Sequence, residues 1–242
     1  MTSSQRALKA SQSDIFATYD WYDRHNLLRL LAGDRVNYMA SCVERVWGKG
    51  AFTQQEVLEV GCGGGLLCGE LARRGLVVSG VDPSAGSLAG ARQYVDKLQL
   101  GQNVGLYEGS AESLPYADGS FSVVVCMDVL EHVQDLSATV REIARVLAPG
   151  GIFIFDTINR TFLARLVLIW IGERFFQRWG LVPGLHVHSM FIKPRELRAE
   201  LERNKLHIRE LTGFMPGIVE GRLTLTPGGF KSVSYIGYAT KE

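Results

Sequence analysis

The sequence predicts an open α/β fold built on a mostly parallel sheet. Strand-like apolar runs alternate with helix-like segments between residues 55 and 156, as in parallel strands joined by right-handed crossover helices. The runs lack a polar–apolar alternation, as expected when helices cover both faces of a sheet. The first run, at residues 57–60, breaks at a glycine-rich turn, residues 61–65, that leads into a helical pattern. Because ligands of such folds bind beyond the carboxyl ends of the strands, this turn marks the expected site.

The other elements follow from their residue patterns. Apolar and aromatic residues at helical spacing between residues 13 and 47 predict two or three N-terminal helices, and Pro194 starts a charged helix that ends near Asn204. In chain order we expect strands at 57–60, 76–82, 104–108, 121–127 and 151–156, with helices at 66–74, 87–97, from about 129, and at 137–147. Segments near 207–211 and 232–239 predict antiparallel C-terminal strands that close the sheet.

The chain is expected to divide near residue 50. Residues 1–50 would form an N-terminal helical cap, and residues 51–242 the sheet domain, with an apolar insert at about 160–190 after the fifth strand. A chain of 242 residues suits one such domain with additions.

Bulk composition narrows the class of protein. Apolar residues make up 46% and charged residues 21%, and the net charge of +1 gives no electrostatic case for nucleic acid. The four cysteines, Cys42, Cys62, Cys68 and Cys126, form no C-x-x-C pair or zinc spacing, which fits a reducing compartment. The N-terminus lacks an apolar signal region. We therefore expect a cytoplasmic protein with no nucleic-acid partner.

The insert contains the most apolar stretch of the chain, at residues 162–179, from Phe162 to Trp179. It is too short, and too interrupted by Arg165, Glu173 and Arg174, to span a bilayer. Because this apolar stretch lies beside the expected site, we expect either a lid that covers an apolar substrate pocket or an interfacial helix in peripheral membrane contact. An inserted core helix is the alternative.

The glycine turn indicates a nucleotide-like cofactor. A strand that ends in glycines and opens a helix places bare backbone N–H groups beside a ligand. Gly61 and Gly63 fit the dinucleotide fingerprint, but Leu66 stands where its third glycine is needed for close helix packing. The preceding Glu59 fits the pattern E-x-G-x-G-x-G, in which the acid orders the turn or meets the ammonium of S-adenosylmethionine. An NAD-dependent oxidoreductase is therefore the minor interpretation.

Two further segments suit the same cofactor. Asp82 lies 21 residues after Gly61 at the end of the second strand, where a carboxylate can accept two hydrogen bonds from a ribose diol. Its alternative role is to cap the following helix. After the third strand, Gly109, Ser110, Ala111 and Glu112 can present a backbone N–H and a side-chain oxygen to an adenine edge.

Taken together, the motifs resemble those of class I S-adenosylmethionine-dependent methyltransferases. The resemblance rests on EVGCGGG, GVD, GSAESLPYADGSFSVVVCMDVLEHV and LAPGG over about residues 55–156. Within this class the sequence is similar to the ubiquinone-biosynthesis O-methyltransferase (3-demethylubiquinone 3-O-methyltransferase) family, through CMDVLEHV, TINR, GLH, FIKPREL, LTG and the late FK and VSY. The resemblance implies a Rossmann-like fold, S-adenosyl-L-methionine as cofactor, and an insert that contacts membranes.

Carried over to this sequence, the resemblance implies a set of cofactor contacts. Arg35 would meet the cofactor carboxylate, and Met127 would lie against the cofactor. The full expected set is Arg35, Glu59, Gly61, Cys62, Gly63, Asp82, Pro83, Ala111, Glu112 and Met127.

The resemblance also implies that Asp128, Glu131 and His132 correspond to an acidic, acidic, histidine trio linked to a divalent metal. Asp128 replaces a glutamate of the family pattern. Spacing of i, i+3 and i+4 would put all three on one face of a helix, where they could bind Mg²⁺ or Zn²⁺ and so chelate a catechol. Without metal, His132 or Glu131 could act as general base. A capping carboxylate and a packed histidine are the alternative.

The expected reaction is methyl transfer to a hydroxyl of a hydrophobic aromatic small molecule, with a prenylated catechol or quinol precursor as the best candidate. His186 is a further candidate for the acceptor pocket, whereas a surface or core position is expected for His188. The alternatives are a natural-product O-, N- or C-methyltransferase, and a catalytically weak module that binds membranes or partners.

Overall fold

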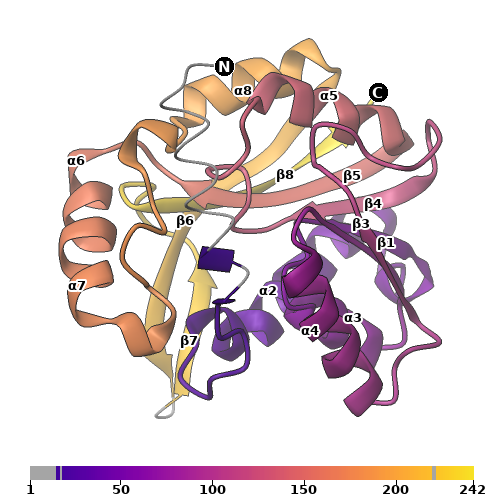
Figure 1. The fold of residues 1–242 in the computed structure, drawn as a ribbon. Helices are drawn as coiled ribbons and strands as arrows, with labels where there is room; N and C mark the ends of the chain where they lie inside the picture. Colours follow the sequence, from indigo (N-terminus) through magenta and orange to yellow (C-terminus); the bar gives the residue numbers. More distant parts are fainter. Residues whose placement is uncertain (1–14, 17, 220–221) are drawn as a thin grey trace.

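A computed structural model describes residues 15–16, 18–219 and 222–242. Over these residues the strands form one eight-stranded sheet in the order β3-β2-β1-β4-β5-β8-β6-β7 (Figure 1). The strands are β1 (Glu56–Val60), β2 (Val77–Asp82), β3 (Val104–Glu108), β4 (Phe121–Cys126), β5 (Leu147–Ile158), β6 (Leu206–Val219), β7 (Arg222–Pro227) and β8 (Ser234–Lys241). β1 to β5 pair in parallel, whereas β8 runs antiparallel to β5 and β6. The predicted mostly parallel sheet with an antiparallel C-terminal end is confirmed.

Helices cover both faces of this sheet (Figure 1). The helices are α2 (Leu27–Trp47), α3 (Leu66–Arg73), α4 (Ala85–Lys97), α5 (Leu136–Val146) and α8 (Pro194–Arg203). α2, α3 and α4 pack on one face, where Met39, Leu71 and Leu88 share a buried cluster with Val57 of β1. α5 and α8 pack on the other face, where Ile143 and Leu201 are buried. Two covered faces explain why the parallel strands read as unbroken apolar runs.

The N-terminal cap shares its core with the sheet. Helical backbone occurs at Ile15, Phe16 and Thr18 and again over the long α2, and residues 19–26 between them are not helical, with turns at 21–22 and 24–25. The Asn26 side chain accepts a hydrogen bond from the backbone N–H of Leu28 and so caps α2. The start of the predicted helical region, residues 13–14, lies outside the described residues. A domain boundary near residue 50 stays a prediction.

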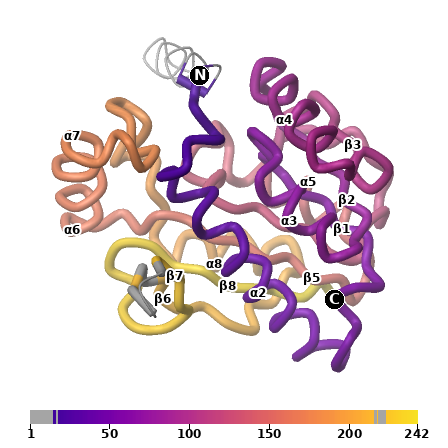
Figure 2. The backbone as a smooth tube through the Cα atoms, turned by 90° about the horizontal axis from the view of Figure 1, so that it is seen from below, coloured from indigo at the N-terminus to yellow at the C-terminus, as the bar shows by residue number. Residues whose placement is uncertain are grey.

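The apolar stretch is helical. It comprises α6 (Phe162–Ala164), a π-helix η2 (Arg165–Gly172), α7 (Glu173–Phe175) and a 3₁₀ turn η3 (Gln177–Trp179), and we call residues 162–179 the apolar segment. Residues 19–26 run between this segment and the α3–α4 side of the molecule (Figures 1 and 2). Within the described residues, no helix is long and apolar enough to cross a membrane.

The C-terminal strands confirm the predicted antiparallel closure and add one element. β6 pairs with β8 as expected, and it continues into a hairpin with β7, which the sequence did not suggest. All four cysteines are free and buried, as expected for reduced thiols that act as small hydrophobes.

Candidate active site

The glycine turn joins β1 to α3 through a backbone that favours glycine. Gly61, Gly63 and Gly65 have φ of 77°, 49° and 71°, in the left-handed region that side chains disfavour. The backbone N–H of Gly61 donates to the Val81 carbonyl at 2.7 Å, and that of Cys62 donates to the same oxygen at 3.1 Å. These bonds fix the turn against the end of β2.

Asp82 ties the two strand ends together. Its Oδ2 accepts from the backbone N–H of Gly63 at 2.8 Å, and its Oδ1 accepts from that of Ser84 at 2.8 Å. The pKa of this carboxyl is raised, because the effect of burial outweighs the two backbone hydrogen bonds, which lower it. The structure thus gives Asp82 the local bonding role, and the ribose contact stays a prediction.

An aromatic segment covers the turn. A Cβ at Gly63 would lie 2.5 Å from Cη2 of Trp21, and one at Gly64 would also collide with this ring. Phe16 stacks on Trp21 with ring centroids 6.1 Å apart, and the Tyr22 hydroxyl donates to the Gly64 carbonyl at 2.9 Å. The sequence predicts helices for the aromatic residues at 16–22, and the resemblance relates residues 20–26 to recognition of the acceptor; their contact with the glycine turn, some 40 residues away, has no local pattern.

Glu59 lies beneath the turn with an unused oxygen. This β1 side chain is 5% exposed, and its Oε2 has no hydrogen-bond partner. Burial raises the pKa of Glu59 to about 8, opposed by hydrogen bonds from Cys68. An unpartnered buried carboxyl oxygen below a glycine turn fits a ligand with a polar or cationic tail.

The other predicted cofactor residues lie at the same edge of the sheet. Met127 directly follows β4 and is 8% exposed, Pro83 directly follows β2, and the buried Ala111 follows β3. Glu112 bonds the Ser110 hydroxyl and accepts from the backbone N–H of Gln134 at 2.9 Å. Carboxyl ends of four parallel strands thus converge, and this donor set fits S-adenosylmethionine.

Arg35 lies in a buried charge cluster. Its guanidinium pairs with Asp128 and donates from Nε to Asp156 Oδ2 at 3.3 Å, while Asp156 Oδ1 accepts from the backbone N–H of Asp128 at 2.6 Å. Burial and the charge of Asp128 raise the pKa of Asp156 to about 7, whereas Arg35 lowers it. The predicted contact of Arg35 with the cofactor carboxylate stays a prediction.

The predicted helix from Val129 is wrong. Residues 127–134 form turns, and α5 begins only at Leu136, after its cap Asp135. Asp128 has φ of 54°, and its N–H donates to the Asp156 carboxylate at 2.6 Å, so the segment after β4 begins with a left-handed residue that is bonded to β5. Residues 128, 131 and 132 therefore do not share a helix face, contrary to the prediction from their i, i+3 and i+4 spacing.

The members of the trio have different partners. Asp128 contacts Arg35, Glu131 Oε2 accepts from the Thr157 hydroxyl at 2.8 Å, and the His132 ring packs against Phe16 at 5.4 Å. In the part of the chain that the structure describes, no three His, Cys, Asp or Glu side chains are arranged to hold a metal. The residues do not fit the expected divalent cation.

The two predicted bases differ in proton affinity. Glu131 is 2% exposed with Oε1 unpartnered, and burial together with Asp128 and Asp156 raises its pKa to about 8. Burial and the neighbouring His186 lower the pKa of His132 to about 3, so this imidazole is neutral at physiological pH and a weak base.

His186 lies beside His132, with ring centroids 5.7 Å apart. Its Nδ1 is 3.1 Å from Oε1 of Glu173, a buried residue of the apolar segment that the sequence analysis treated only as an interruption. The available signal in the sequence was a single acidic residue inside an apolar stretch, because a buried carboxylate needs hydrogen-bond donors nearby. His188 instead lies with Nε2 3.2 Å from the Thr161 carbonyl, as expected for a packed histidine.

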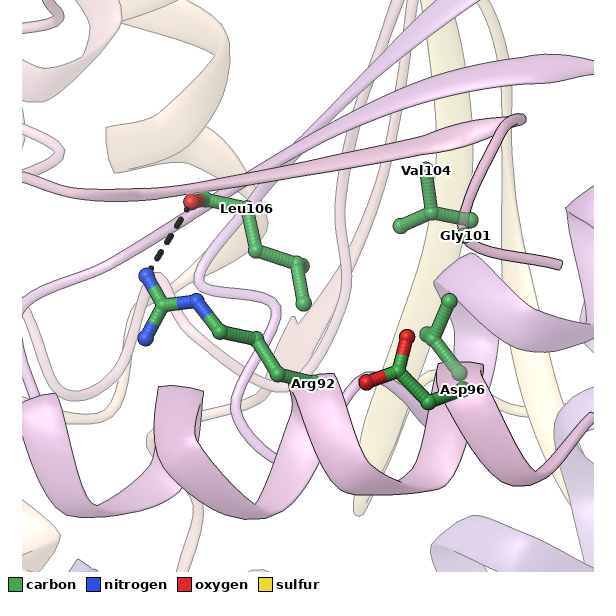
Figure 3. A pocket seen from close by; sticks show the side chains of 6 residues that line it. Arg92, Asp96, Gly101, Val104 and Leu106 are labelled. Carbon is green, nitrogen blue, oxygen red and sulfur yellow. Dashed lines mark hydrogen bonds between the residues drawn. The ribbon is translucent and has the colours of Figure 1, made fainter. Parts of the chain in front are cut away.

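A separate cavity lies at the far edge of the sheet (Figure 3). Its volume is about 240 Å³, and its lining comes from α4, β3 and the loop between them, with Arg92 donating to the Leu106 carbonyl at 3.2 Å. None of the predicted site residues lines it.

Comparisons with known proteins agree with this geometry. Residues 58–155 match a family model described as a methyltransferase domain. A ubiquinone biosynthesis O-methyltransferase of Coxiella burnetii is 32% identical over 248 aligned positions that cover 100% of both chains. One of the same name from Azorhizobium caulinodans is 38% identical over 159 residues, 66% of this chain but only 61% of that relative.

The fold is also that of solved methyltransferases. A crystal structure of an S-adenosylmethionine-dependent methyltransferase from Aquifex aeolicus gives a TM-score of 0.63 at 15% identity, covering 97% of this chain and 98% of that one. At this identity the match supports the predicted class I fold alone. The full-length Coxiella match and the methyltransferase-domain match identify the family. The chain is an S-adenosylmethionine-dependent methyltransferase and belongs to the ubiquinone biosynthesis O-methyltransferase family.

Proposed function

We propose that the protein methylates a phenolic hydroxyl of a hydrophobic catechol or quinol, a precursor of ubiquinone. The observation that supports this most is that two neighbouring histidines are connected to the apolar segment by hydrogen bonds. The imidazoles of His132 and His186 pack together after the carboxyl end of β4, and the loop that carries His186 is tied to the apolar segment through Glu173. The name of the full-length Coxiella relative supports the same acceptor class.

The chemistry asks the protein mainly for positioning and proton removal. The bound cofactor would supply an electrophilic sulfonium methyl group. We assign its binding to the ten residues predicted above, with Glu59 and Asp82 as the polar contacts below the turn. Glu131 and His132 are the predicted catalytic residues, and of these Glu131 has the higher proton affinity. Because Asp128, Glu131 and His132 each have another partner, the proposed reaction uses no metal ion, and turnover should persist in excess chelator.

The apolar segment is proposed as a peripheral membrane contact that also admits the acceptor. Its large apolar side chains are unusually exposed, Phe162 at 68% and Phe175 at 70%. The Arg165 guanidinium lies 5.2 Å from the centre of the Trp170 ring, which places a cation beside an aromatic anchor. The exposed set is Phe162, Leu163, Val167, Trp170, Ile171, Phe175, Phe176 and Trp179.

Liposome flotation tests this contact. With anionic vesicles, we expect the protein to float, and the double variant Phe162→Ser/Phe175→Ser to stay in the soluble fraction because its buried apolar area in the bilayer is lost. Phe230→Ser is the matched control, since Phe230 is 83% exposed on another part of the chain. A wild-type protein that remains soluble would leave the segment as a lid only.

The acceptor is tested by a methyl-transfer assay with catechols of increasing prenyl length. We expect kcat/KM to rise with tail length, because each buried methylene adds about 0.8 kcal/mol of transfer free energy. Cofactor binding by calorimetry runs in parallel. Cofactor binding without transfer to any catechol would contradict the proposed acceptor and favour a natural-product methyltransferase with another acceptor atom.

A further inference from the structure

Glu173 is a buried carboxylate in the most apolar part of the chain. It is 5% exposed, whereas Phe175, two residues later, is 70% exposed. Three N–H groups converge on it. The backbone N–H of Gly184 donates to Oε2 at 2.7 Å, and the backbone N–H of His186 donates to Oε1 at 2.8 Å, with His186 Nδ1 3.1 Å from the same oxygen. Burying a carboxylate is costly unless it is hydrogen-bonded, and this set of donors meets that need.

The bond fixes the tautomer of His186. A carboxylate can only accept, so Nδ1 carries the proton and Nε2 keeps its lone pair as a proton acceptor. The His186 side chain is 8% exposed. Its ring is held between His132, at 5.7 Å, and Phe191, at 6.1 Å in an edge contact. Both the tautomer and the orientation of the ring are therefore set by the fold.

The two predicted bases are less well arranged for proton transfer. His132 is neutral and weakly basic because it is buried against His186. Glu131 bonds Thr157 and shares its surroundings with Asp128 and Asp156, so ionising it places three carboxylates near one another. His186 differs from both because the Glu173 carboxylate is hydrogen-bonded to its Nδ1.

We propose that His186 is the catalytic base of this methyl transfer and that Glu173 is its positioning residue. This inference rests on the proposed function. The acceptor O–H bond breaks and its proton goes to Nε2. The oxygen lone pair forms the bond to the methyl carbon, and the bond from that carbon to sulfur breaks, leaving its electron pair on sulfur. The resulting imidazolium is stabilised by the opposed charge of Glu173 and then loses its proton to water.

The tautomer can be measured without turnover. Long-range ¹H–¹⁵N spectra of protein labelled at histidine nitrogen should show His186 protonated at Nδ1, with the signal assigned by its loss in His186→Asn. A resting protein with His186 protonated at Nε2 would overturn the inference. This outcome does not depend on which acceptor the protein uses.

Kinetics supply the second test, at saturating cofactor. His186→Asn should lower kcat roughly 100-fold or more, within the range for losing a general base, while the acceptor KM and the cofactor Kd change less than about threefold. His207→Asn is the control, because His207 pairs with Glu242 at the end of the chain. An unchanged kcat in His186→Asn would contradict the role of His186, whereas an inactive wild type that binds cofactor would contradict the proposed function instead.

Glu173→Gln keeps the size of the side chain and removes its charge. We expect kcat to fall at least tenfold with little change in the acceptor KM, together with a mixed His186 tautomer. If Glu173 only anchors the loop, this variant will lower the melting temperature and leave kcat per folded molecule unchanged. Should it fail to fold, the spectra of the wild type and the kinetics of His186→Asn still decide the inference.

Discussion

The proposed cofactor side and the proposed acceptor side of this enzyme are built in different ways. The proposed cofactor side is mostly one contiguous segment, in which β1, the glycine turn and α3 occupy residues 56–73. Asp82 at the end of β2 accepts a hydrogen bond from this turn. The acceptor side gathers side chains from distant parts of the chain, including Phe16, His132, Glu173 and His186.

The two sides therefore depend on different kinds of interaction. The glycine turn is defined by its backbone geometry, so any chain that adopts the same turn presents the same backbone N–H groups. The acceptor side depends on long-range contacts such as the hydrogen bond from the Tyr19 hydroxyl to the Gly180 carbonyl at 2.9 Å. Substitutions on the two sides should therefore fail in different ways, and three experiments test this.

The largest expected effect is on folding, at the buried charge cluster of Arg35, Asp128 and Asp156. Asp156→Ala removes one of the two carboxylates that pair with the buried Arg35, and it leaves the backbone N–H of Asp128 without its partner. Breaking a buried pair from one side costs about 3–5 kcal/mol in the free energy of unfolding. Urea denaturation measures it, with Glu202→Ala as the control, because the Arg198–Glu202 pair is exposed and should contribute less than about 1 kcal/mol. Equal losses in both variants would contradict a cluster that holds distant segments together.

The second effect is on cofactor affinity. Gly63→Ala adds a Cβ where φ is 49° and where Trp21 lies 2.5 Å away, so the turn or its aromatic cover must move. We expect the cofactor Kd to rise at least about 100-fold, equivalent to about 2.7 kcal/mol. Gly150→Ala is the matched control, because its φ is 74° but nothing lies within 4 Å of the added carbon. It should lose stability and keep the wild-type Kd, and a Gly63→Ala Kd within threefold of wild type would refute the role of the turn.

The smallest effect is a pH dependence beneath the turn. The pKa of Glu59 in the folded protein is raised from 4.5 to about 8, so the folded state retains a proton that the unfolded state has lost. Stability from this proton is present below pH 4.5 and disappears as the pH rises to about 8. Glu59→Gln has no proton to lose, so its unfolding free energy relative to wild type should increase by about 2 kcal/mol between pH 6 and pH 8.

Melting curves without cofactor measure this difference. Glu131 and Asp156 have pKa values raised in the same direction, so their contribution is common to both proteins and cancels in the comparison. A constant difference between the two proteins across this pH range would mean that Glu59 is ionised throughout.

The sequence predicted the parallel strands and the glycine turn far better than the loops and long-range contacts around them. Unbroken apolar runs located β1 to β5 because both faces of the sheet are buried, and the glycine turn has the expected backbone. The segment after β4 misled the prediction, because its spacing looked helical while Asp128 adopts φ of 54° against Asp156. The covering role of Trp21 and the bond of Glu173 to His186 are contacts between distant segments, which no local pattern encodes.

The most direct test of this account is a single-turnover methyl transfer from bound S-adenosylmethionine to a prenylated catechol, in wild type and in His186→Asn. We predict transfer by the wild type and a rate at least about 100-fold lower in the variant, with the same cofactor Kd in both. Equal rates in the two proteins would contradict a base supplied by the acceptor side.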